Sequence, residues 1–162
     1  MALNAYLKLK GQKQGEIKGS VTQKGRENKI LVIAANHDIT SPRDTTTGLA
    51  TGKRIHKPLI ITKELDKATP LLYNSLVNNE LITEFELQFW TPQKSANTGI
   101  DKERQHYTIK LTNACVVDIK FRMPNNKNPD LVNLAEYEEI AFNYQKIEWL
   151  WTDGGITTTD NW

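Results

Sequence analysis

Few residues in this chain have the types and the spacing that catalysis requires. His37 and Asp38 are adjacent and could form an oriented imidazole–carboxylate pair, which hydrolases use for general base catalysis. Such a hydrolase also needs a nucleophile on a sharp turn, but the chain contains no G-x-S-x-G motif. Cys115 is the single cysteine, and strand alternation predicts that it points into the core. We therefore predict no catalytic residues and no enzymatic activity, with a hydrolase built on His37 and Asp38 as the weakest alternative.

The spacing of possible metal or phosphate ligands gives no support for a cofactor. The three histidines, His37, His56 and His106, lie far apart and form no HxH or HExxH motif. The segment GLATGKR, from Gly48 to Arg54, partly matches a phosphate-binding loop but has three residues between its glycines where that motif has four. Arg54 also stands where a serine or threonine would bind magnesium. We predict neither a metal nor a cofactor.

The tryptophans offer one alternative function. Indole rings can stack on the apolar faces of a sugar, so the chain could be a carbohydrate-binding β-sandwich module. The competing interpretation is that these side chains pack in the core or at an interface. The four tryptophans are Trp90, Trp149, Trp151 and Trp162.

The elements that would position these residues are mainly strands. Apolar and polar side chains alternate along residues 3–9 and 81–89, which is typical of strands with one buried face. Residues 30–39 are apolar on both parities, which predicts a strand covered on both faces. Along residues 140–151 the apolar parity changes near Gln145 or Lys146, which predicts one long strand with a β-bulge.

A further strand and one helix are predicted from local patterns. Residues 115–123 alternate so that Cys115 and the odd-numbered residues after it should form the buried face. Thr69 is a good N-cap and Pro70 a good first helical residue, so a short helix should start there and end near Asn78.

These patterns together predict the fold class and the domain organisation. A protein with several long strands avoids exposed sheet edges by closing its sheets, so we predict a mainly β protein. Its expected architecture is a two-sheet β-barrel with one short α-helix alongside and a long extended loop. The 162 residues fit one domain, 1–162, because domains usually hold about 100 to 200 residues.

Composition excludes several classes of partner. The chain has 21 basic and 19 acidic side chains, and a formal charge of +2 is too small to indicate nucleic-acid binding. No apolar run approaches the roughly 18 residues that span a bilayer, so we expect no membrane insertion. Residues 1–10 alternate polar and apolar side chains, so we expect no conventional signal peptide and folding in the cytosol.

Two surface features suggest contact between copies of the chain. The polar stretch from Thr40 to Arg54 is about fifteen residues long, which exceeds most connections in a compact domain. Fully extended it could span about 50 Å and lie on a neighbour, although a mobile surface hairpin is equally compatible with its composition. Residues 8–29 are mostly basic and residues 134–150 mostly acidic, so copies could meet head to tail, unless these charges are solvated or paired within one subunit.

Several strings, in this order and over nearly the whole chain, resemble the haemolysin-coregulated protein (Hcp) family, the tube subunits of bacterial type VI secretion systems. They are EIKGSV at 16–21, TGKRIHKPLIITKELD at 51–66 with the TPLLYNSL segment after it, and YQKIEWLWTDGGI at 144–156. The R-I-H-x-P and Y-x-K-I-x-W patterns are similar to those of the enterobacterial-type branch.

The resemblance implies a structural function for the chain. It implies a two-sheet β-barrel with a helix alongside, assembling into hexameric rings that stack into a tube and carry or chaperone effectors. The partners it implies are copies of the chain itself, the type VI spike protein, the contractile sheath and small effector proteins in the ring lumen. The implied location is the bacterial cytoplasm during assembly, followed by secretion outside the cell or into a target cell without a cleaved signal peptide.

The resemblance also assigns the long loop. In the family an extended loop reaches a neighbouring subunit or ring, and it matches Ser41 to Arg54 here. We assign no lumen-facing residues, and because the sequence stops at Trp162 we expect no C-terminal effector extension. The candidate subunit-interface residues are Ser41, Pro42, Arg43, Asp44, Thr47, Gly48, Thr51, Gly52, Lys53 and Arg54.

Overall fold

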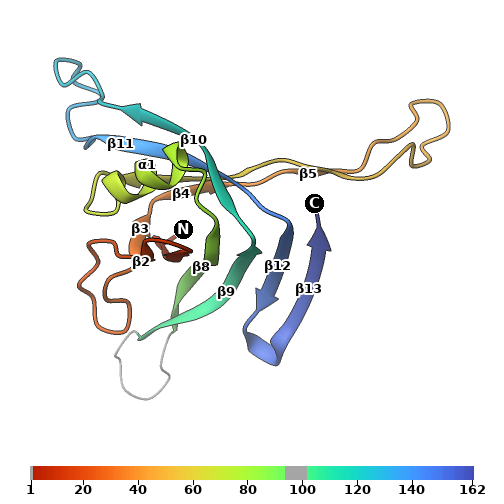
Figure 1. Ribbon diagram of the computed structural model, residues 1–162, viewed down its shortest axis with the longest axis horizontal. Coiled ribbons are helices and arrows are strands. Elements are labelled where there is room, and N and C mark those ends of the chain that lie inside the picture. The colour runs from red at the N-terminus through yellow and green to blue at the C-terminus, as the bar shows by residue number, and fades with distance from the viewer. Residues whose placement is uncertain (1, 94–101) are drawn as a thin grey trace.

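The larger of two antiparallel sheets forms one side of the molecule. A computed structural model describes residues 2–93 and 102–162 (Figure 1). The strands of this sheet follow the order β13-β12-β9-β8-β1-β2, with β3 also paired to β1. Its strands are β1 (Ala5–Gly11), β2 (Gly15–Ile17), β3 (Ile30–Val32), β8 (Ile82–Gln93), β9 (Lys102–Thr112), β12 (Lys146–Trp151) and β13 (Ile156–Asn161).

A smaller sheet, in the order β10-β11-β7-β4, packs against the first. Two short strands form a separate pair, β5 with β6. The prediction of a mainly β protein with two main sheets and one short helix is confirmed. Within the described residues neither sheet closes into a barrel, because each sheet ends in edge strands. The remaining elements are β4 (Ala34–Asn36), β5 (Ile39–Thr40), β6 (Ile55–His56), β7 (Leu59–Glu64), α1 (Thr69–Val77), β10 (Cys115–Arg122), β11 (Tyr137–Asn143) and the short 3₁₀ helix η1 (Asp153–Gly155).

The core lies between the inner faces of the two sheets. Leu7 and Leu87 from the large sheet and Ile61 from the small sheet are fully buried. The rings of Phe85 and Phe142 meet edge to face with centroids 4.9 Å apart, which joins β8 to β11 across the core. The alternation that the sequence predicted is confirmed by burial at Leu7 and Leu9 of β1 and at Phe85 and Leu87 of β8. It fails at Tyr6 and Gln88, which are also buried, and at Thr83, which is exposed.

The segment predicted as one long strand with a β-bulge is two strands in different sheets. β11 pairs with β7 and β10 in the small sheet, whereas β12 pairs with β9 and β13 in the large sheet. Tyr144 and Gln145 connect them. The prediction of a bulge was wrong because the change of parity marks the point where the chain crosses between sheets.

The segment predicted as one strand over residues 30–39 is likewise divided. β3 pairs with β1 in the large sheet, and β4 pairs with β7 in the small sheet. Ile30 and Val32 are buried, but all three residues of β4 are exposed. The expected cover on both faces is therefore absent over β4 within this chain.

The side-chain parity predicted for β10 fails at Val116 and Val117 but holds at Ile119, which packs against the core. Val116 is buried, whereas Phe121 is 53 % exposed and Cys115 is only partly buried. A shift of register between Val116 and Asp118 reverses the faces of the strand. Simple alternation from Cys115 could not reveal this shift.

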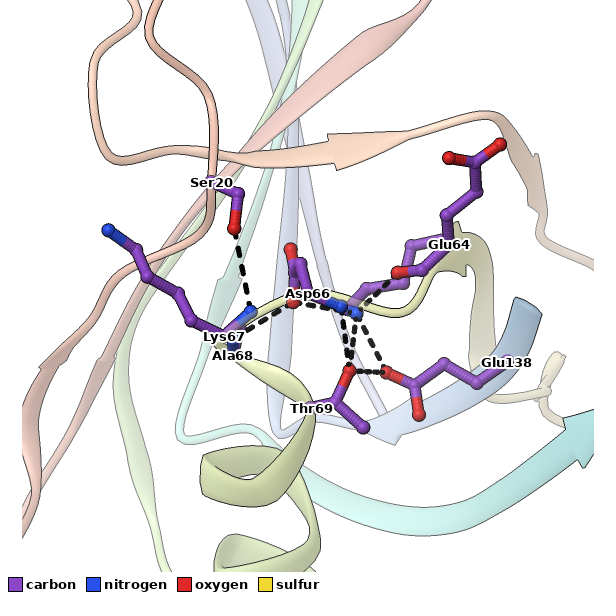
Figure 2. Close-up of polar contacts among 8 residues, drawn as sticks. Ser20, Glu64, Asp66, Lys67, Ala68, Thr69 and Glu138 are labelled. Atoms are coloured by element: carbon purple, nitrogen blue, oxygen red, sulfur yellow. Dashed lines mark hydrogen bonds and ion pairs between the residues drawn. The ribbon is translucent and has the colours of Figure 1, made fainter. Parts of the chain in front are cut away.

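The helix α1 was predicted correctly except for its cap. It spans Thr69–Val77 with proline in its first turn, and its N-cap is Ala68. The Thr69 hydroxyl instead accepts a hydrogen bond from the Asp66 backbone N–H at 3.1 Å and donates to Glu138 Oε1 at 2.9 Å. Figure 2 shows Asp66, Thr69 and Glu138 converging at this end of the helix, which ties α1 to the small sheet.

Candidate functional site

A hairpin that we call the arm, residues 39–56, projects from the two-sheet body (Figure 1). It consists of β5, β6 and the connection between them, so it contains every residue assigned to the candidate interface loop. The strands pair antiparallel, with Ile39 opposite His56 and Thr40 opposite Ile55. The predicted long loop is thus a hairpin whose two sides pair at the root and near the tip.

The tip of the arm is built around the Asp44 carboxylate. Its Oδ1 accepts hydrogen bonds from the backbone N–H of Thr46 at 2.9 Å and of Thr47 at 2.6 Å. The bonds from Thr47 and Thr46 lower the pKa of Asp44 below its usual value. Gly48 follows with φ +71°, a left-handed conformation that glycine adopts without a steric penalty. The candidate residues Asp44, Thr47 and Gly48 therefore make the turn itself.

Further hydrogen bonds link the two sides of the arm. Arg43 and Ala50 form an isolated antiparallel bridge, and the Thr51 N–H donates to the Pro42 carbonyl at 3.1 Å. Most side chains of the candidate interface residues are available for contact. Pro42 and Asp44 are partly buried, and the other candidate residues are exposed. The arm also exposes two large apolar side chains, Leu49 at 68 % and Ile55 at 52 %.

The root of the arm is held by a chain of polar groups around Tyr144. The Tyr144 hydroxyl lies 2.7 Å from His37 Nε2 and 2.8 Å from His56 Nδ1. The other ring nitrogen of His56, Nε2, lies 2.9 Å from Asp160 in β13. The Trp162 ring stacks on His56 with centroids 5.8 Å apart. His37 and His56 are therefore held by the β11–β12 connection, and His56 also by the C-terminal end of the chain.

Arg54 belongs to the root and not to the tip. Its guanidinium forms a two-bonded ion pair with the Asp160 carboxylate. This hydrogen bonding lowers the pKa of Asp160 to about 2, with a smaller contribution from His56. Lys53 and Arg54 are the two basic residues of the candidate interface nearest the root. Arg54 pairs with Asp160 of its own chain, whereas Lys53 is exposed.

The alternative sites from the sequence are not assembled. His37 bonds Tyr144, and the carboxylate that orients a histidine here is Asp160 beside His56, so a His37–Asp38 catalytic pair is not formed. Over residues 2–93 and 102–162, no group of histidine, cysteine and acidic side chains could hold a metal ion. No helix in the same described part of the chain is both long and apolar enough to cross a membrane.

The tryptophans lie in separate environments. Trp90 stacks under the Arg26 guanidinium at 3.8 Å. Trp149 packs against the core, Trp151 meets His106, and Trp162 meets His56. A common surface of indole rings, which the carbohydrate-binding alternative requires, is therefore not formed.

Comparison with known proteins decides the family. Residues 6–151 match the family model described as "Type VI secretion system effector, Hcp". The chain belongs to the Hcp family. It is thus a secreted tube protein of the type VI secretion system, in a structural and non-enzymatic family, as the sequence resemblance predicted.

Individual relatives agree over their full length. The chain is 37 % identical to the "Major exported protein" of Pseudomonas aeruginosa, over 100 % of this chain and 96 % of that protein. The structure of the Hcp1 protein from Escherichia coli EAEC 042 is similar with a TM-score of 0.85 and 32 % identity, over 99 % of both chains. The secreted protein Hcp3 from P. aeruginosa gives a TM-score of 0.76 and 31 % identity, over 98 % of this chain and 97 % of that one.

Sequence reasoning missed the residues that anchor the arm of this Hcp chain. Sequence analysis assigned no role to Tyr144 or to Asp160. The signal that could have indicated them is weak, because Tyr144 lies 107 residues from His37 and Asp160 lies 104 residues from His56. Such distant pairs become visible only when the sheets are assembled.

Proposed function

We propose that this Hcp chain assembles with copies of itself into hexameric rings, which stack into a tube and carry or chaperone small effector proteins in the lumen. The arm makes the contact with a neighbouring copy. The type VI spike protein and contractile sheath are the proposed assembly partners, and the single domain 1–162 is exported after assembly in the bacterial cytoplasm. The observation that carries the proposal is an arm that projects from the body with exposed side chains along it (Figure 1).

The distribution of apolar surface supports contact between unlike faces of two copies. Leu49 and Ile55 are exposed on the arm, while Phe121 and Leu134 are 53 % and 55 % exposed at the β10–β11 end. Figure 1 shows the arm and the β10–β11 connection at opposite ends of the long axis. Two such unlike patches can pair head to tail, and repeated pairing closes a ring when the rotation allows it.

The basic and acidic segments contribute less than the sequence suggested. Lys8 pairs with Glu84 at 2.8 Å, and Arg26 pairs with Glu103 at 2.6 Å. Glu138 is buried and pairs with Lys63. Several of these charges are therefore neutralised within one chain, so we assign the contact between copies chiefly to the arm.

Charge reversal on the arm tests this proposal. Arg43→Glu and Lys53→Glu change exposed side chains, so the unfolding transition should stay within about 0.5 kcal/mol of wild type. Sedimentation velocity and negative-stain images should show rings for wild type and a lower assembled fraction for both variants. Lys24→Glu, an exposed change outside the arm, serves as the matched control. Wild-type protein that stays monomeric at every concentration would refute ring formation, and unchanged assembly of both variants would remove the arm from the mechanism.

A further inference from the structure

Backbone pairing does not set the direction in which the arm projects. Among the described residues, β5 and β6 pair only with each other and belong to neither main sheet. At the base of the arm, the Lys57 N–H donates to the Asp38 carbonyl at 3.1 Å, which again joins one side of the arm to the other. A two-stranded hairpin is at best marginally stable by itself in water. Side chains at the root must therefore hold the arm at its angle to the body.

Both ends of the arm lead into the small sheet. One side follows β4 and the other runs into β7, and these two strands are paired neighbours in that sheet. A hairpin attached at two adjacent points can swing about the line that joins them, as in a hinge. The Tyr144 hydroxyl lies 2.7 Å from His37 and 2.8 Å from His56, one on each side of the root. It therefore holds the two attachment points together, and a contact further out is needed to fix the angle.

Asp160 provides this further contact. Its carboxylate accepts two hydrogen bonds from the Arg54 guanidinium and, at 2.9 Å, one from His56 Nε2. Arg54 and His56 are two residues apart in an extended segment, so their side chains share one face, and Arg54 lies about 7 Å nearer the tip. Asp160 belongs to β13, the edge strand of the large sheet. The contact thus ties the arm to the sheet that its own ends do not enter.

Neighbouring groups fix Asp160 and shield it from water. The Asn161 N–H donates to Asp160 Oδ1 at 3.0 Å, and the Trp162 ring stacks on His56 with centroids 5.8 Å apart. The side chains of His56 and Asp160 are only 2 % and 19 % exposed, so their contact is less weakened by solvent than an ordinary surface pair. Figure 1 shows the C-terminal end of β13 beside the root of the arm. Hydrogen bonds from Arg54 lower the pKa of Asp160 to about 2, so the carboxylate stays charged at neutral pH.

We propose that Asp160 is the positioning residue of the arm, which through Arg54 and His56 fixes the angle of the arm to the body and so decides whether contacts between copies close into a ring. The consequence rests on the proposed function, in which the arm makes that contact. A head-to-tail contact closes a ring only when every copy adds the same suitable rotation, and otherwise continues as an open chain. Leu49 and Ile55 remain exposed whatever the angle. A loosened arm should therefore still bind a neighbour but form assemblies of mixed size.

The angle of the arm can be followed by the distance between two spin labels, measured by double electron–electron resonance. Thr45→Cys places one label on the exposed tip and Glu16→Cys places the other on β2, in a Cys115→Ser background. Labelled chains are diluted into an excess of unlabelled chains, so that each signal comes from a single chain. The chain without a change at Asp160 should give one narrow distance, whereas Asp160→Asn should give a broad distribution. A distribution that stays equally narrow in Asp160→Asn would overturn the proposal.

Two further variants separate positioning from general loosening of the β12–β13 hairpin. Arg54→Gln removes the outer partner, whose side chain is 53 % exposed, so the body should stay folded while the distances broaden. Asp153→Asn is the matched control, because Asp153 forms a similar ion pair with Arg104, at 3.0 Å and 2.7 Å, beside the turn of the same hairpin. Its distances should stay narrow. Equal broadening in Asp153→Asn, or a narrow distribution in Arg54→Gln, would refute the proposal even if Asp160→Asn fails to fold.

Assembly of the same variants is measured by mass photometry and negative-stain imaging. Wild type and Asp153→Asn should form rings of one size, whereas Asp160→Asn and Arg54→Gln should form open or mixed assemblies. Uniform rings from a variant with broad distances would show that the angle of the arm does not control closure. Wild-type monomers at every concentration would refute ring formation, while the distance distributions would still decide whether Asp160 positions the arm.

Discussion

Lys63 and Glu138 lie directly opposite each other across β7 and β11, with Nζ and Oε1 2.7 Å apart and both side chains fully buried. Lys63 Nζ also donates to Asp66 at 2.9 Å and to the Thr69 hydroxyl at 3.1 Å. Figure 2 shows Asp66, Thr69 and Glu138 gathered at the start of the helix. The ion pair thus joins the centre of the small sheet to α1. Burying two charges costs several kcal/mol, so the pair is favourable only while both partners and their hydrogen bonds are present.

Removing one partner of this pair should therefore destabilise the fold strongly. Lys63→Met leaves the Glu138 carboxylate buried without its cation, so the free energy of unfolding should fall by about 3 to 5 kcal/mol. Lys63→Met combined with Glu138→Leu removes both charges and should recover most of that loss. Lys10→Met, an exposed lysine in β1, should change stability by less than about 0.5 kcal/mol. Urea unfolding measures all three, and a double variant as unstable as Lys63→Met would contradict this account.

The same lysine shows how far the sequence predicts the fold. Lys63 shares the parity of the buried Leu59 and Ile61, so its side chain lies on the same face of β7 as theirs. Alternation cannot say that its partner is Glu138, which lies 75 residues later and is brought opposite by the pairing of β7 with β11. Local periodicity therefore indicated β1, β8 and the helix, while long-range pairing determined which sheet each strand joined and where two predicted strands divide.

The sequence likewise predicted one part of the candidate site, the arm, but not the residues that anchor it. Composition and length indicated the arm, because a polar stretch of about fifteen residues without periodicity is unusual in a compact domain. They could not indicate its anchor, since Tyr144 and Asp160 are remote in sequence from the histidines and lie in the β11–β12 connection and in β13. The crossing from β11 to β12 that positions Tyr144 appeared in the sequence only as a change of parity, which a bulge would also produce.

Arg26 fixes the long connection between β2 and β3 to the large sheet. Its guanidinium lies 3.8 Å from the centre of the Trp90 ring, and Nη1 donates to the Tyr6 hydroxyl at 3.0 Å. It also pairs with Glu103 at 2.6 Å. Only 5 % of Arg26 is exposed, so these contacts are largely shielded from water and gain strength.

Arg26→Met should lower the free energy of unfolding by about 1 to 3 kcal/mol, because it removes the cation from the ring and leaves the Tyr6 hydroxyl without this donor. Lys24→Met changes an exposed lysine in the same connection and should have little effect. Urea unfolding followed by tryptophan fluorescence measures both. Equal stability of the two variants would show that the contact with Trp90 contributes nothing.

Glu80 clamps the turn between β1 and β2 to the end of the helix. Its Oε1 accepts from the backbone N–H of Lys13 at 2.6 Å and of Gln14 at 2.8 Å. Burial alone would raise the pKa of Glu80, but hydrogen bonds from Gln14, Lys13 and Ser75 outweigh burial and lower the pKa below 4.5. The carboxylate therefore stabilises the fold above pH 4.5, and this stabilisation is lost as pH falls through the lowered value.

Glu80→Gln should cost about 1 to 3 kcal/mol at pH 7, because the amide replaces one acceptor oxygen by a donor. The difference between wild type and the variant should shrink as unfolding is measured at successively lower pH below 4.5, because the wild-type carboxyl then takes up its proton. Glu16→Gln, an exposed change in β2, provides the control. A difference that is constant from pH 7 to pH 3 would show that ionisation of Glu80 does not matter.

The β10–β11 end should receive the neighbouring copy if the rings form head to tail. Phe121 and Leu134 line a hollow of about 400 Å³ there, together with Met123 and Tyr137. Burying one large apolar side chain contributes about 1.5 to 3 kcal/mol, so Phe121→Ser with Leu134→Ser should weaken assembly by at least about tenfold in dissociation constant. Because both side chains are more than half exposed in the single chain, its unfolding should change little.

Sedimentation equilibrium at several concentrations measures this effect on assembly. Val77→Ser, at the end of α1 and 72 % exposed, removes a comparable apolar side chain from another element and serves as the control. Weakened assembly of the Phe121 and Leu134 double variant with an unchanged control supports a contact between the arm and this end. If Val77→Ser weakens assembly equally, any loss of apolar surface has the same effect and the β10–β11 end is not the specific acceptor.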